Sequence, residues 1–366
     1  MSKIIVVAFA LRSSGAKTIY LQFLEHLKDY SNRDLYYLFV DTDMPQPIIK
    51  NVVYFPVSLR GNIRRLWFDY MGCSILLKNN KILPDLVISL QNTGVYCLKN
   101  IPQIIYYHQF LPLSPQQWNP LKRDQRTLFF YRNIYPLFVK NALFSGTQVI
   151  VQVPFIKKEF VKRYRFNQDN VHVLFPDIEK IDVQDIVPFN FDDKFVHFIY
   201  PATNQPYKEH VTLVHAMNEL KKNDRNIANL VQIHLTLDFT ESDKLVKLMD
   251  KLGVRDFFKF EGIVPHEILL SMYRSSRALL FPSSIETLGL PLLEAARFGL
   301  PIIVADLDYA HEVLKNYDGV SFVQCKDYKC WAKLIKNSVL KKMHYSSLVP
   351  SKTSDWDIFF DIIKNI

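Results

Sequence analysis

The sequence predicts an α/β protein made of two consecutive, doubly wound domains. Apolar runs rich in Val and Ile alternate with segments of helical periodicity from end to end, a pattern typical of parallel sheets covered by helices. The chain has 366 residues, more than one hydrophobic core usually accommodates, and the alternation stops near the middle and then restarts. Apolar residues make up 49% of the chain and aromatic residues 14%, which excludes disordered, collagen-like and coiled-coil proteins.

The first half begins with a continuous apolar run at 3–10, which we interpret as a buried first strand. Further strands are expected at 35–40, 51–55, 86–89, 103–107 and 148–152, and amphipathic helical stretches at 18–30, 62–78 and 120–144. Pro176, Pro188 and a cluster of acidic residues interrupt the periodicity over 175–194. We therefore place the domain boundary in that segment, with domains at 1–185 and 186–352.

The second half repeats the pattern and ends in an amphipathic helix. Strands are expected at 195–200, 231–237, 257–261, 278–281, 301–305 and 320–323, and the final helix at 353–366 around Trp356. Two doubly wound domains in succession predict a ligand cleft between them, at the carboxyl ends of their strands.

The net charge of +9 is confined to the N-terminal half. Residues 1–185 hold 23 Lys and Arg against 14 Asp and Glu, whereas residues 186–366 hold 22 of each. A cationic half attracts an anionic partner, such as nucleic acid, a phosphorylated acceptor or an acidic membrane surface. Composition alone does not choose among these partners.

Other features narrow the protein class. No apolar run is long enough for a transmembrane helix, and the first ten residues lack a signal-peptide cleavage site, so a cytoplasmic protein is expected. The four cysteines follow neither a disulfide pattern nor a metal-site spacing, and are interpreted as reduced, packed thiols. No metal site is predicted; Asp41 and Asp43 have the spacing of a metal-diphosphate motif but follow an early strand of the first domain.

The most informative segment is Ala278-Leu-Leu-Phe-Pro-Ser-Ser-Ile-Glu286-Thr-Leu-Gly289-Leu-Pro291-Leu-Leu-Glu294. It predicts a strand, a short loop and a helix with Pro291 in its first turn. The free N–H groups at such a helix start suit a diphosphate. Glu294, expected in the first turn of the helix, can accept hydrogen bonds from a ribose diol, and Glu286 from sugar hydroxyls. Alternatively, Glu286 is a capping carboxylate and Glu294 a solvated helix residue.

The segment, together with Gly299-Leu-Pro-Ile-Ile-Val-Ala-Asp306 after it, resembles the retaining GT-B glycosyltransferases of family 4, the glycosyl transferases group 1. The resemblance implies two Rossmann-like domains that face a central cleft, with the acceptor bound by the first domain and a nucleotide-sugar donor by the second. It implies that Glu294 binds the donor ribose and Glu286 the transferred sugar. Backbone amides of Thr287, Leu288 and Gly289 would contact sugar and phosphate.

The family's diphosphate-binding segment corresponds to Pro201-Ala-Thr203-Asn-Gln-Pro-Tyr-Lys208. The resemblance assigns Lys208 to the diphosphate, whereas Thr203 stands where the family has Arg. Lys17 or Arg12 are candidates to replace that missing cation. Gly262, Ile263 and Val264 are similar to the family loop whose backbone holds the nucleobase.

Two positions in the first half resemble family residues that face donor and acceptor. Gly15 lies where the family has a glycine-rich loop, although an ordinary βα turn explains it equally well. His108 directly follows the expected strand 103–107 and resembles the cleft histidine that positions the transferred sugar or acceptor; otherwise it is a packed or surface histidine. Trp356 resembles a residue of the family's closing helix, which packs back on the N-terminal domain, or is an ordinary core residue.

The resemblance implies a metal-independent, cofactor-independent reaction in which the leaving diphosphate helps deprotonate the acceptor hydroxyl. The donor is expected to be a UDP-sugar, and the acceptor a glycan or lipid-linked saccharide of a surface polysaccharide. Two basic, aromatic segments, 60–68 and 120–144, are candidates for peripheral contact with an anionic inner membrane face, or are solvated outer helices. No nucleic-acid module is present. The alternative function is a catalytically silent nucleotide-sugar-binding subunit, which the missing Arg would explain.

Overall fold

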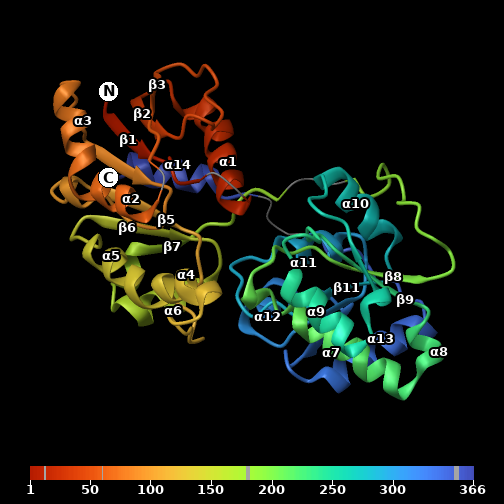
Figure 1. The fold of residues 1–366 in the computed structure, drawn as a ribbon. Helices are drawn as coiled ribbons and strands as arrows, with labels where there is room; N and C mark the ends of the chain where they lie inside the picture. Colours follow the sequence, from red (N-terminus) through yellow and green to blue (C-terminus); the bar gives the residue numbers. More distant parts are fainter. Residues whose placement is uncertain (12–13, 60, 179–181, 350–353) are drawn as a thin grey trace. The chain divides into compact units, whose positions relative to one another are not determined.

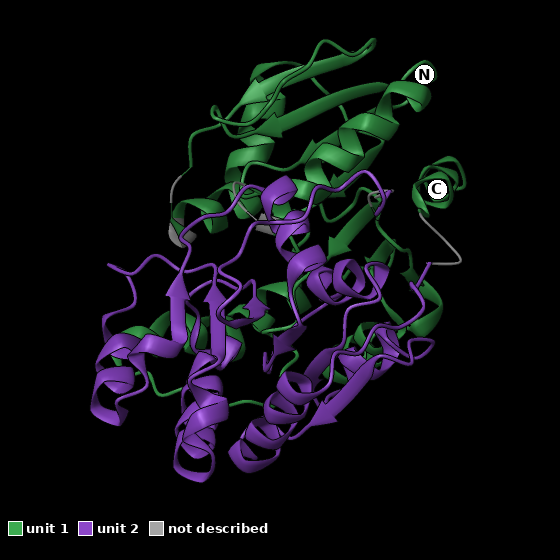
Figure 2. Ribbon diagram, turned by 90° about the vertical axis from the view of Figure 1, so that its right-hand side faces the viewer, with its two compact units in different colours: residues 1–179, 352–366 green, residues 180–351 purple. Residues whose placement is uncertain are grey.

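The structure is a computed structural model that describes residues 1–11, 14–59, 61–178, 182–349 and 354–366. The chain forms two compact units, residues 1–179 with 352–366 and residues 180–351 (Figures 1 and 2). Each unit is a parallel sheet covered by helices on both faces, so the two Rossmann-like domains expected from the sequence are confirmed.

In the described residues, unit 1 holds a seven-stranded sheet in the order β3-β2-β1-β4-β5-β6-β7. Its strands are β1 (Lys3–Val7), β2 (Leu35–Val40), β3 (Val52–Pro56), β4 (Leu86–Ser89), β5 (Gln103–Tyr107), β6 (Thr147–Val151) and β7 (Val171–Val173). Its helices are α1 (Ser14–Tyr30), α2 (Asn62–Trp67), α3 (Cys73–Asn79), α4 (Arg126–Phe129), α5 (Tyr135–Asn141), α6 (Pro154–Tyr164) and α14 (Trp356–Lys364). The short strand β7 was not expected from the sequence, because three residues are too few to show a period.

The helices α2 and α3 are joined by a π-helical turn at Phe68–Gly72, and α4 and α5 by another at Phe130–Ile134. Both predicted amphipathic stretches are therefore helical but wider than an α-helix at one turn. Such turns insert a residue into the helix and redirect the side chains around it.

The described residues of unit 2 hold a six-stranded sheet in the order β10-β9-β8-β11-β12-β13. Its strands are β8 (Val196–Tyr200), β9 (Val231–Leu235), β10 (Phe258–Phe260), β11 (Ala278–Phe281), β12 (Ile302–Ala305) and β13 (Val320–Val323). Its helices are α7 (His210–Asn223), α8 (Arg225–Ala228), α9 (Asp243–Leu252), α10 (His266–Ser275), α11 (Leu290–Arg297), α12 (Asp308–Val313) and α13 (Tyr328–Leu340).

Alternate residues of β1 pack into different layers of unit 1, as side chains of a strand must. Ile4 and Val6 lie in a core with residues of α1 and α14, whereas Ile5 and Val7 lie in a core with residues of the α2–α3 segment. Burial on both faces explains why the strand is apolar throughout instead of alternating.

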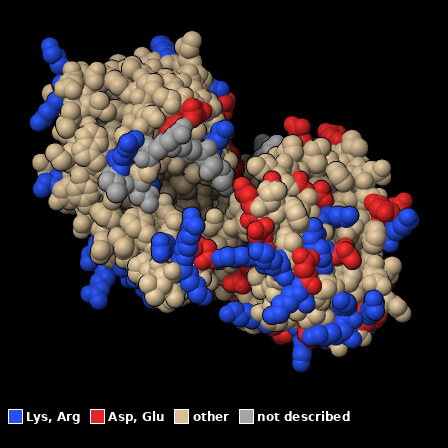
Figure 3. Space-filling view, viewed as in Figure 1, with Lys and Arg blue, Asp and Glu red and all other residues tan. Residues whose placement is uncertain are grey.

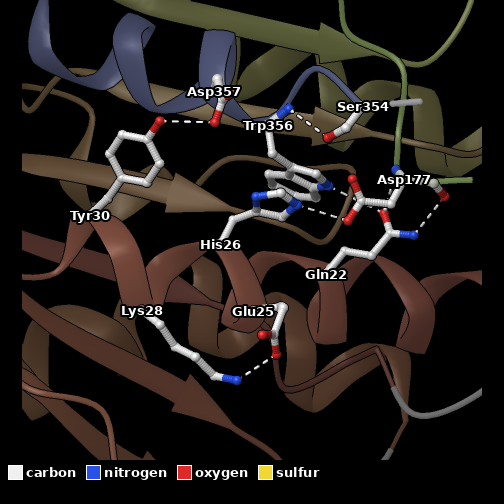
Figure 4. Close-up of polar contacts among 9 residues, drawn as sticks. All are labelled: Gln22, Glu25, His26, Lys28, Tyr30, Asp177, Ser354, Trp356 and Asp357. Carbon is white, nitrogen blue, oxygen red and sulfur yellow. Dashed lines mark hydrogen bonds and ion pairs between the residues drawn. The ribbon is translucent and has the colours of Figure 1, made fainter. Parts of the chain in front are cut away.

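The last helix, α14, belongs to unit 1 and packs on α1 (Figure 4). The Trp356 indole donates to Gln22 Oε1 over 3.2 Å, and the Tyr30 hydroxyl donates to Asp357 over 2.9 Å. The ring of Phe360 stacks on Tyr30 with centroids 4.3 Å apart. These contacts tie the C-terminal helix to the first helix of the chain.

Candidate active site

Both sheets reverse their strand order at one place, between β1 and β4 in unit 1 and between β8 and β11 in unit 2. In parallel sheets, ligands bind at the carboxyl ends of the two strands that flank this switch point, because their loops diverge there. In unit 2 the loops after β8 and β11 are tied together. The backbone N–H and hydroxyl of Ser284 both donate to the Tyr207 carbonyl, over 2.8 and 2.9 Å.

The two loops bring Lys208 and Glu286 into direct contact. Lys208 Nζ lies 2.5 Å from Glu286 Oε1, and the two side chains are only 16% and 13% exposed. The Tyr200 hydroxyl donates to the Lys208 carbonyl, also over 2.5 Å. A partly desolvated ion pair of this kind is weak evidence for a purely stabilising role, since removing two ions from water offsets much of their attraction.

Three tyrosines surround the Glu286 carboxylate. The pKa of Tyr207 is raised to about 12 by burial and by the negative charge of Glu286. The pKa values of Tyr200 and Tyr309 are raised well above their ordinary value by the same two causes. The phenols thus stay protonated, and Lys208 supplies the positive charge beside Glu286.

The helix α11 begins beside this pair. Its N-cap is Gly289, which has a φ of +61° that favours glycine. Thr287 is partly buried and Leu288 is buried in the loop that leads from Glu286 to the helix. The free N–H groups of the first turn therefore follow the loop that carries Glu286, as the sequence indicates.

Glu294 lies in the second turn of α11, not in the first as expected. The Tyr273 hydroxyl donates to Glu294 Oε2 over 3.1 Å, and His266 Nε2 lies 3.1 Å from Glu294 Oε1. The carboxylate is 15% exposed, and burial together with its charge raises the pKa of Tyr273 well above the ordinary value. Two groups from α10 therefore hold Glu294 in place, which a merely solvated helix residue would not require.

The other donor-binding candidates lie at the same edge of the sheet. Gly262 follows β10, two strands from β8, and has a φ of +70°. Ile263 is 99% exposed, and Val264 is partly buried. Thr203 is exposed in the loop after β8, and its carbonyl accepts from the backbone N–H of Gln205.

In unit 1, His108 lies at the carboxyl end of β5, next to the loop after β4. Its backbone N–H donates to Asn92 Oδ1 over 2.7 Å, and its Nε2 lies 3.2 Å from the Leu90 carbonyl oxygen. Nε2 also lies 3.4 Å from Asn92 Nδ2, and the shorter contact, to a carbonyl that only accepts, places the hydrogen on Nε2. Burial lowers the pKa of His108 to about 4, helped by the positive charge of Arg65. At neutral pH the ring is uncharged, and its Nδ1 is a hydrogen-bond acceptor.

The remaining candidates, all from the first part of the chain, are Gly15, Lys17 and Arg12. Gly15 and Lys17 are exposed in the first turn of α1, and Arg12 lies outside the described residues. Within the described ranges, no group of three or more His, Cys, Asp or Glu side chains is arranged to hold a metal ion. No helix found in the described part of the chain is both long and apolar enough to cross a bilayer.

Sequence reasoning missed the residues that hold the candidates in place. Tyr273 and His266 support Glu294, and Leu90 and Asn92 support His108. The sequence held one signal for Asn92, because an Asn in the loop after a strand tolerates the left-handed conformation, and its φ is +69°. The sequence held no such signal for Tyr273 and His266, since only the packing of α10 on α11 reveals their contacts with Glu294.

Comparisons with known proteins show what the chain is similar to. Residues 184–349 match the family "Glycosyl transferases group 1". Among curated proteins, the chain is 26% identical over 209 residues to the O-antigen chain mannosyltransferase RfbU of Salmonella typhimurium, a match that covers 57% of this chain and 56% of that one. It is 27% identical over 187 residues to an uncharacterized glycosyltransferase of Methanocaldococcus jannaschii, covering 48% and 46%. The matches thus span about half the length of these relatives.

Solved structures show the same fold over nearly the whole chain. WaaG, a glycosyltransferase involved in lipopolysaccharide biosynthesis, superposes with a TM-score of 0.65 at 13% identity and covers 93% of this chain and 90% of its own. HepE of Anabaena, solved with UDP and glucose, has a TM-score of 0.62 at 16% identity and the same coverage.

Proposed function

Since residues 184–349 belong to the glycosyl transferases group 1, we propose that the protein is a retaining glycosyltransferase. It transfers a sugar from a UDP-sugar to a glycan or lipid-linked saccharide in surface polysaccharide biosynthesis. The Lys208–Glu286 pair at the unit 2 switch point is the observation that carries this proposal. The relative RfbU, an O-antigen mannosyltransferase, and the complexes of HepE with UDP support the substrate classes.

In this proposal Lys208 and Glu286 contact different parts of the donor, the diphosphate and the sugar. Lys208 neutralises the diphosphate as the bond to the sugar breaks, and the N–H groups at the start of α11 accept part of the same charge. Glu286 orients Lys208 and accepts hydrogen bonds from sugar hydroxyls. Glu294, held by Tyr273 and His266, accepts from the ribose hydroxyls. No metal is needed in this arrangement, because Lys208 supplies the positive charge.

The transfer itself forms a bond from the acceptor oxygen to the anomeric carbon while the bond to the diphosphate breaks. The acceptor proton passes to the leaving diphosphate on the same face of the sugar, which retains the configuration. His108 is neutral, so its Nδ1 accepts a hydrogen bond from a sugar hydroxyl and does not add positive charge. Catalysis then rests on positioning and electrostatic stabilisation.

Unit 1 also carries the membrane contact that we propose. Trp67, Met71 and Ile75 are 49%, 57% and 43% exposed and follow one another at intervals of four residues. Tyr70 and Phe138, with ring centroids 6.4 Å apart, connect this stripe to the neighbouring helix α5. In Figure 3, unit 1 shows Lys and Arg with few acidic side chains, whereas unit 2 shows both signs interspersed. Exposed apolar side chains on a basic surface suit an anionic membrane face.

The membrane contact is tested by sedimentation with vesicles that do or do not contain anionic lipid. The variant Trp67→Ala/Met71→Ala is expected to lose binding to anionic vesicles. Ile48→Ala, which removes an even more exposed apolar side chain elsewhere in unit 1, is expected to bind like the wild type. Equal sedimentation of all three proteins would rule out the contact.

The alternative function is a catalytically silent subunit that only binds the nucleotide sugar. It is favoured by one observation, the exposed Thr203 where the family has Arg. The two functions differ in turnover and not in donor binding, so a binding assay must be paired with a transfer assay.

The decisive experiment is a thermal-shift panel with UDP, GDP, ADP, CMP and their sugar conjugates, because a ligand that binds only the folded state raises the melting temperature. UDP and one UDP-sugar are expected to raise it, and Glu294→Ala to abolish the shift. Hydrolysis or transfer of that sugar then separates the enzyme from the silent subunit. Absence of any shift, or an unchanged shift in Glu294→Ala, would contradict the proposed donor site.

A further inference from the structure

A cluster of polar side chains lies beneath the loop after β4 in unit 1, and none of them belongs to the site described above. Arg65, at the end of α2, is partly buried and points its Nη2 toward three oxygen atoms. It donates to the carbonyl of Gln91, to the Tyr135 hydroxyl over 3.1 Å, and toward Thr93 Oγ1 over 3.4 Å. The guanidinium also lies 5.7 Å from the centre of the Tyr135 ring.

The cluster is closed by two further hydrogen bonds. The Tyr135 hydroxyl donates to the same Gln91 carbonyl over 3.2 Å, so both lone pairs of that oxygen are used. The Thr93 hydroxyl donates to Asp69 Oδ2 over 3.3 Å. Asp69 is 3% exposed, and burial raises its pKa to about 7 even though Arg65 lies nearby.

The two π-helical turns supply this cluster from opposite sides. Asp69 lies within the turn at Phe68–Gly72, and Tyr135 is the first residue after the turn at Phe130–Ile134. Because a π-helical turn costs hydrogen-bond geometry, it is found mostly where a side chain must be redirected, often beside a functional site. One turn brings Asp69 to the Thr93 hydroxyl, and the other precedes Tyr135, which donates to the Gln91 carbonyl.

The carbonyl that is fixed in this way is the middle one of a three-residue turn. Leu90, before Gln91, offers its carbonyl to the His108 ring, and Asn92, after it, accepts from the His108 backbone N–H. Gln91 is 1% exposed, and its Oε1 accepts from the backbone N–H of Ala10 over 2.7 Å, which ties the turn to the end of β1. Moving Gln91 therefore moves both partners of the histidine.

We propose that Arg65 is a positioning residue for His108, acting through the Gln91 carbonyl on the turn that holds the histidine ring and backbone. All three contacts come from one terminal nitrogen, Nη2, at the end of the long planar guanidinium, and the shorter Lys side chain does not place its ammonium there. The positive charge of Arg65 lies against the electron-rich Tyr135 ring. The consequence for catalysis rests on the proposed function, whereas the consequence for the His108 ring does not.

The test compares Arg65→Lys, which keeps the charge, with Gln103→Leu as a matched control. Gln103 holds the far half of the same β4–β5 connection through hydrogen bonds to Val95 and Leu98, and has no contact with the Leu90–Asn92 turn. Each variant is labelled with ¹⁵N-histidine, and the His108 ring signals are assigned by their loss in His108→Gln. Tyr135→Phe, which removes one of the two donors to the Gln91 carbonyl, serves as a milder variant if Arg65→Lys fails to fold.

In the wild-type protein the ring is expected to stay neutral, with hydrogen on Nε2, down to about pH 4. Arg65→Lys keeps the positive charge but displaces the turn, so it is expected to shift the midpoint of the His108 titration through the Leu90 hydrogen bond and the burial of the ring, Tyr135→Phe to shift it less, and Gln103→Leu to leave it unchanged. An unchanged midpoint in Arg65→Lys and Tyr135→Phe, or an equal shift in Gln103→Leu, would overturn the positioning role.

Turnover provides the second readout. Arg65→Lys is expected to lower kcat at least tenfold while the thermal shift caused by UDP stays as in the wild type, since the donor candidates lie in unit 2. A fall in kcat for Gln103→Leu of the same size would also reduce Arg65 to a structural role. The ring titration needs no substrate, so a wild-type protein without transferase activity would contradict the proposed function and leave this inference standing.

Discussion

The two sheets share one topology, yet their switch points carry opposite chemistry. Between β8 and β11, unit 2 presents an ion pair, Lys208–Glu286, surrounded by tyrosines. At the equivalent place between β1 and β4, unit 1 presents the amides of Gln91 and Asn92 beside a neutral His108. The same backbone arrangement is thus equipped for a charged ligand in one unit and for uncharged hydroxyl groups in the other.

This difference follows from what each ligand demands of its surroundings. A diphosphate needs positive charge and free N–H groups, and these act more strongly where the site is partly desolvated. A sugar hydroxyl needs donors and acceptors in fixed directions, and a charge there would only add a desolvation cost. In the proposed function, this contrast assigns the leaving group to unit 2 and the positioning of an uncharged partner to unit 1.

The largest expected effect comes from removing the charge in unit 2. Lys208→Met should lower kcat by about 10²- to 10³-fold, the usual loss when one preorganised group that stabilises developing charge is removed. It also leaves Glu286 without its cation among three phenols. Steady-state transfer kinetics measure the fall in kcat, and thermal unfolding measures the stability lost when Glu286 is unpaired.

The matched control is Lys222→Met, which breaks an exposed ion pair with Glu219 on α7. Exposed pairs contribute at most about 1 kcal/mol, so its kinetics and stability should equal those of the wild type. A kcat of Lys208→Met equal to that of the wild type would show that the ion pair is structural. The assignment of the leaving group to unit 2 would then be wrong.

The next largest expected effect is a loss of folding stability at acidic pH. It concerns a buried histidine in each unit. Burial lowers the pKa of His108 in unit 1 to about 4 and that of His210 in unit 2 to about 3. In the unfolded chain each histidine has a pKa of about 6.5. Because the folded-state values are depressed, the stabilisation is complete above about pH 6.5 and is lost as the pH falls toward 4, by an amount on the order of 2 kcal/mol per histidine.

Melting temperatures measured from pH 7 to pH 4 check this, with His108→Gln and His210→Gln as the variants. Each variant should show a weaker fall of stability with acid than the wild type. Parallel curves for the wild type and His108→Gln would mean that the unit 1 histidine is solvated and charged like an ordinary one, which would remove the contrast between the switch points.

The sequence predicted the local structure around Glu286 in unit 2, and the reason is physical. The strand, loop and helix around Glu286, Gly289 and Pro291 are close together in the chain, so local rules for helix starts and glycine conformations apply to them. The edges of β4, β5, β8, β11 and β13 were also predictable, because buried parallel strands are continuous apolar runs.

What the sequence could not provide were the contacts between distant segments. Arg65 lies 26 residues from Gln91, and Tyr273 lies 21 residues from Glu294. No periodicity relates such positions. The π-helical turns were also missed, because the apolar and polar residues of 62–78 and 120–144 fit an α-helix nearly as well.

A smaller effect is expected at the ribose candidate of unit 2. Glu294→Gln keeps the shape but loses the charge, and Tyr273→Phe removes one hydrogen bond to the carboxylate. A hydrogen bond to a charged group is worth about 1.5 to 3 kcal/mol, so Glu294→Gln should weaken UDP binding about 10- to 100-fold. Tyr273→Phe should weaken it less, because His266 still contacts the other oxygen.

Isothermal titration with UDP ranks the two variants. The sugar part of the donor should add little to the difference, since Glu294 is assigned to the ribose alone. If Tyr273→Phe weakened UDP as much as Glu294→Gln did, the tyrosine would itself contact the ligand instead of holding the carboxylate.

The smallest effect tests the neutral switch point of unit 1. Asn92→Gly preserves the left-handed backbone, since glycine adopts a φ of +69° without strain, but it removes the amide that accepts from His108. Loss of one such hydrogen bond costs about 1 kcal/mol of stability.

Asn51→Gly is the matched control, because Asn51 has a φ of +60° and a side-chain hydrogen bond to the Ser31 carbonyl away from His108. Both variants should lose similar stability in denaturant unfolding, but only Asn92→Gly should lower kcat, by a few fold. Since the backbone conformation is the same in the two variants, a selective loss of turnover is attributable to the His108 contact alone, and an equal loss in both would deny unit 1 its positioning role.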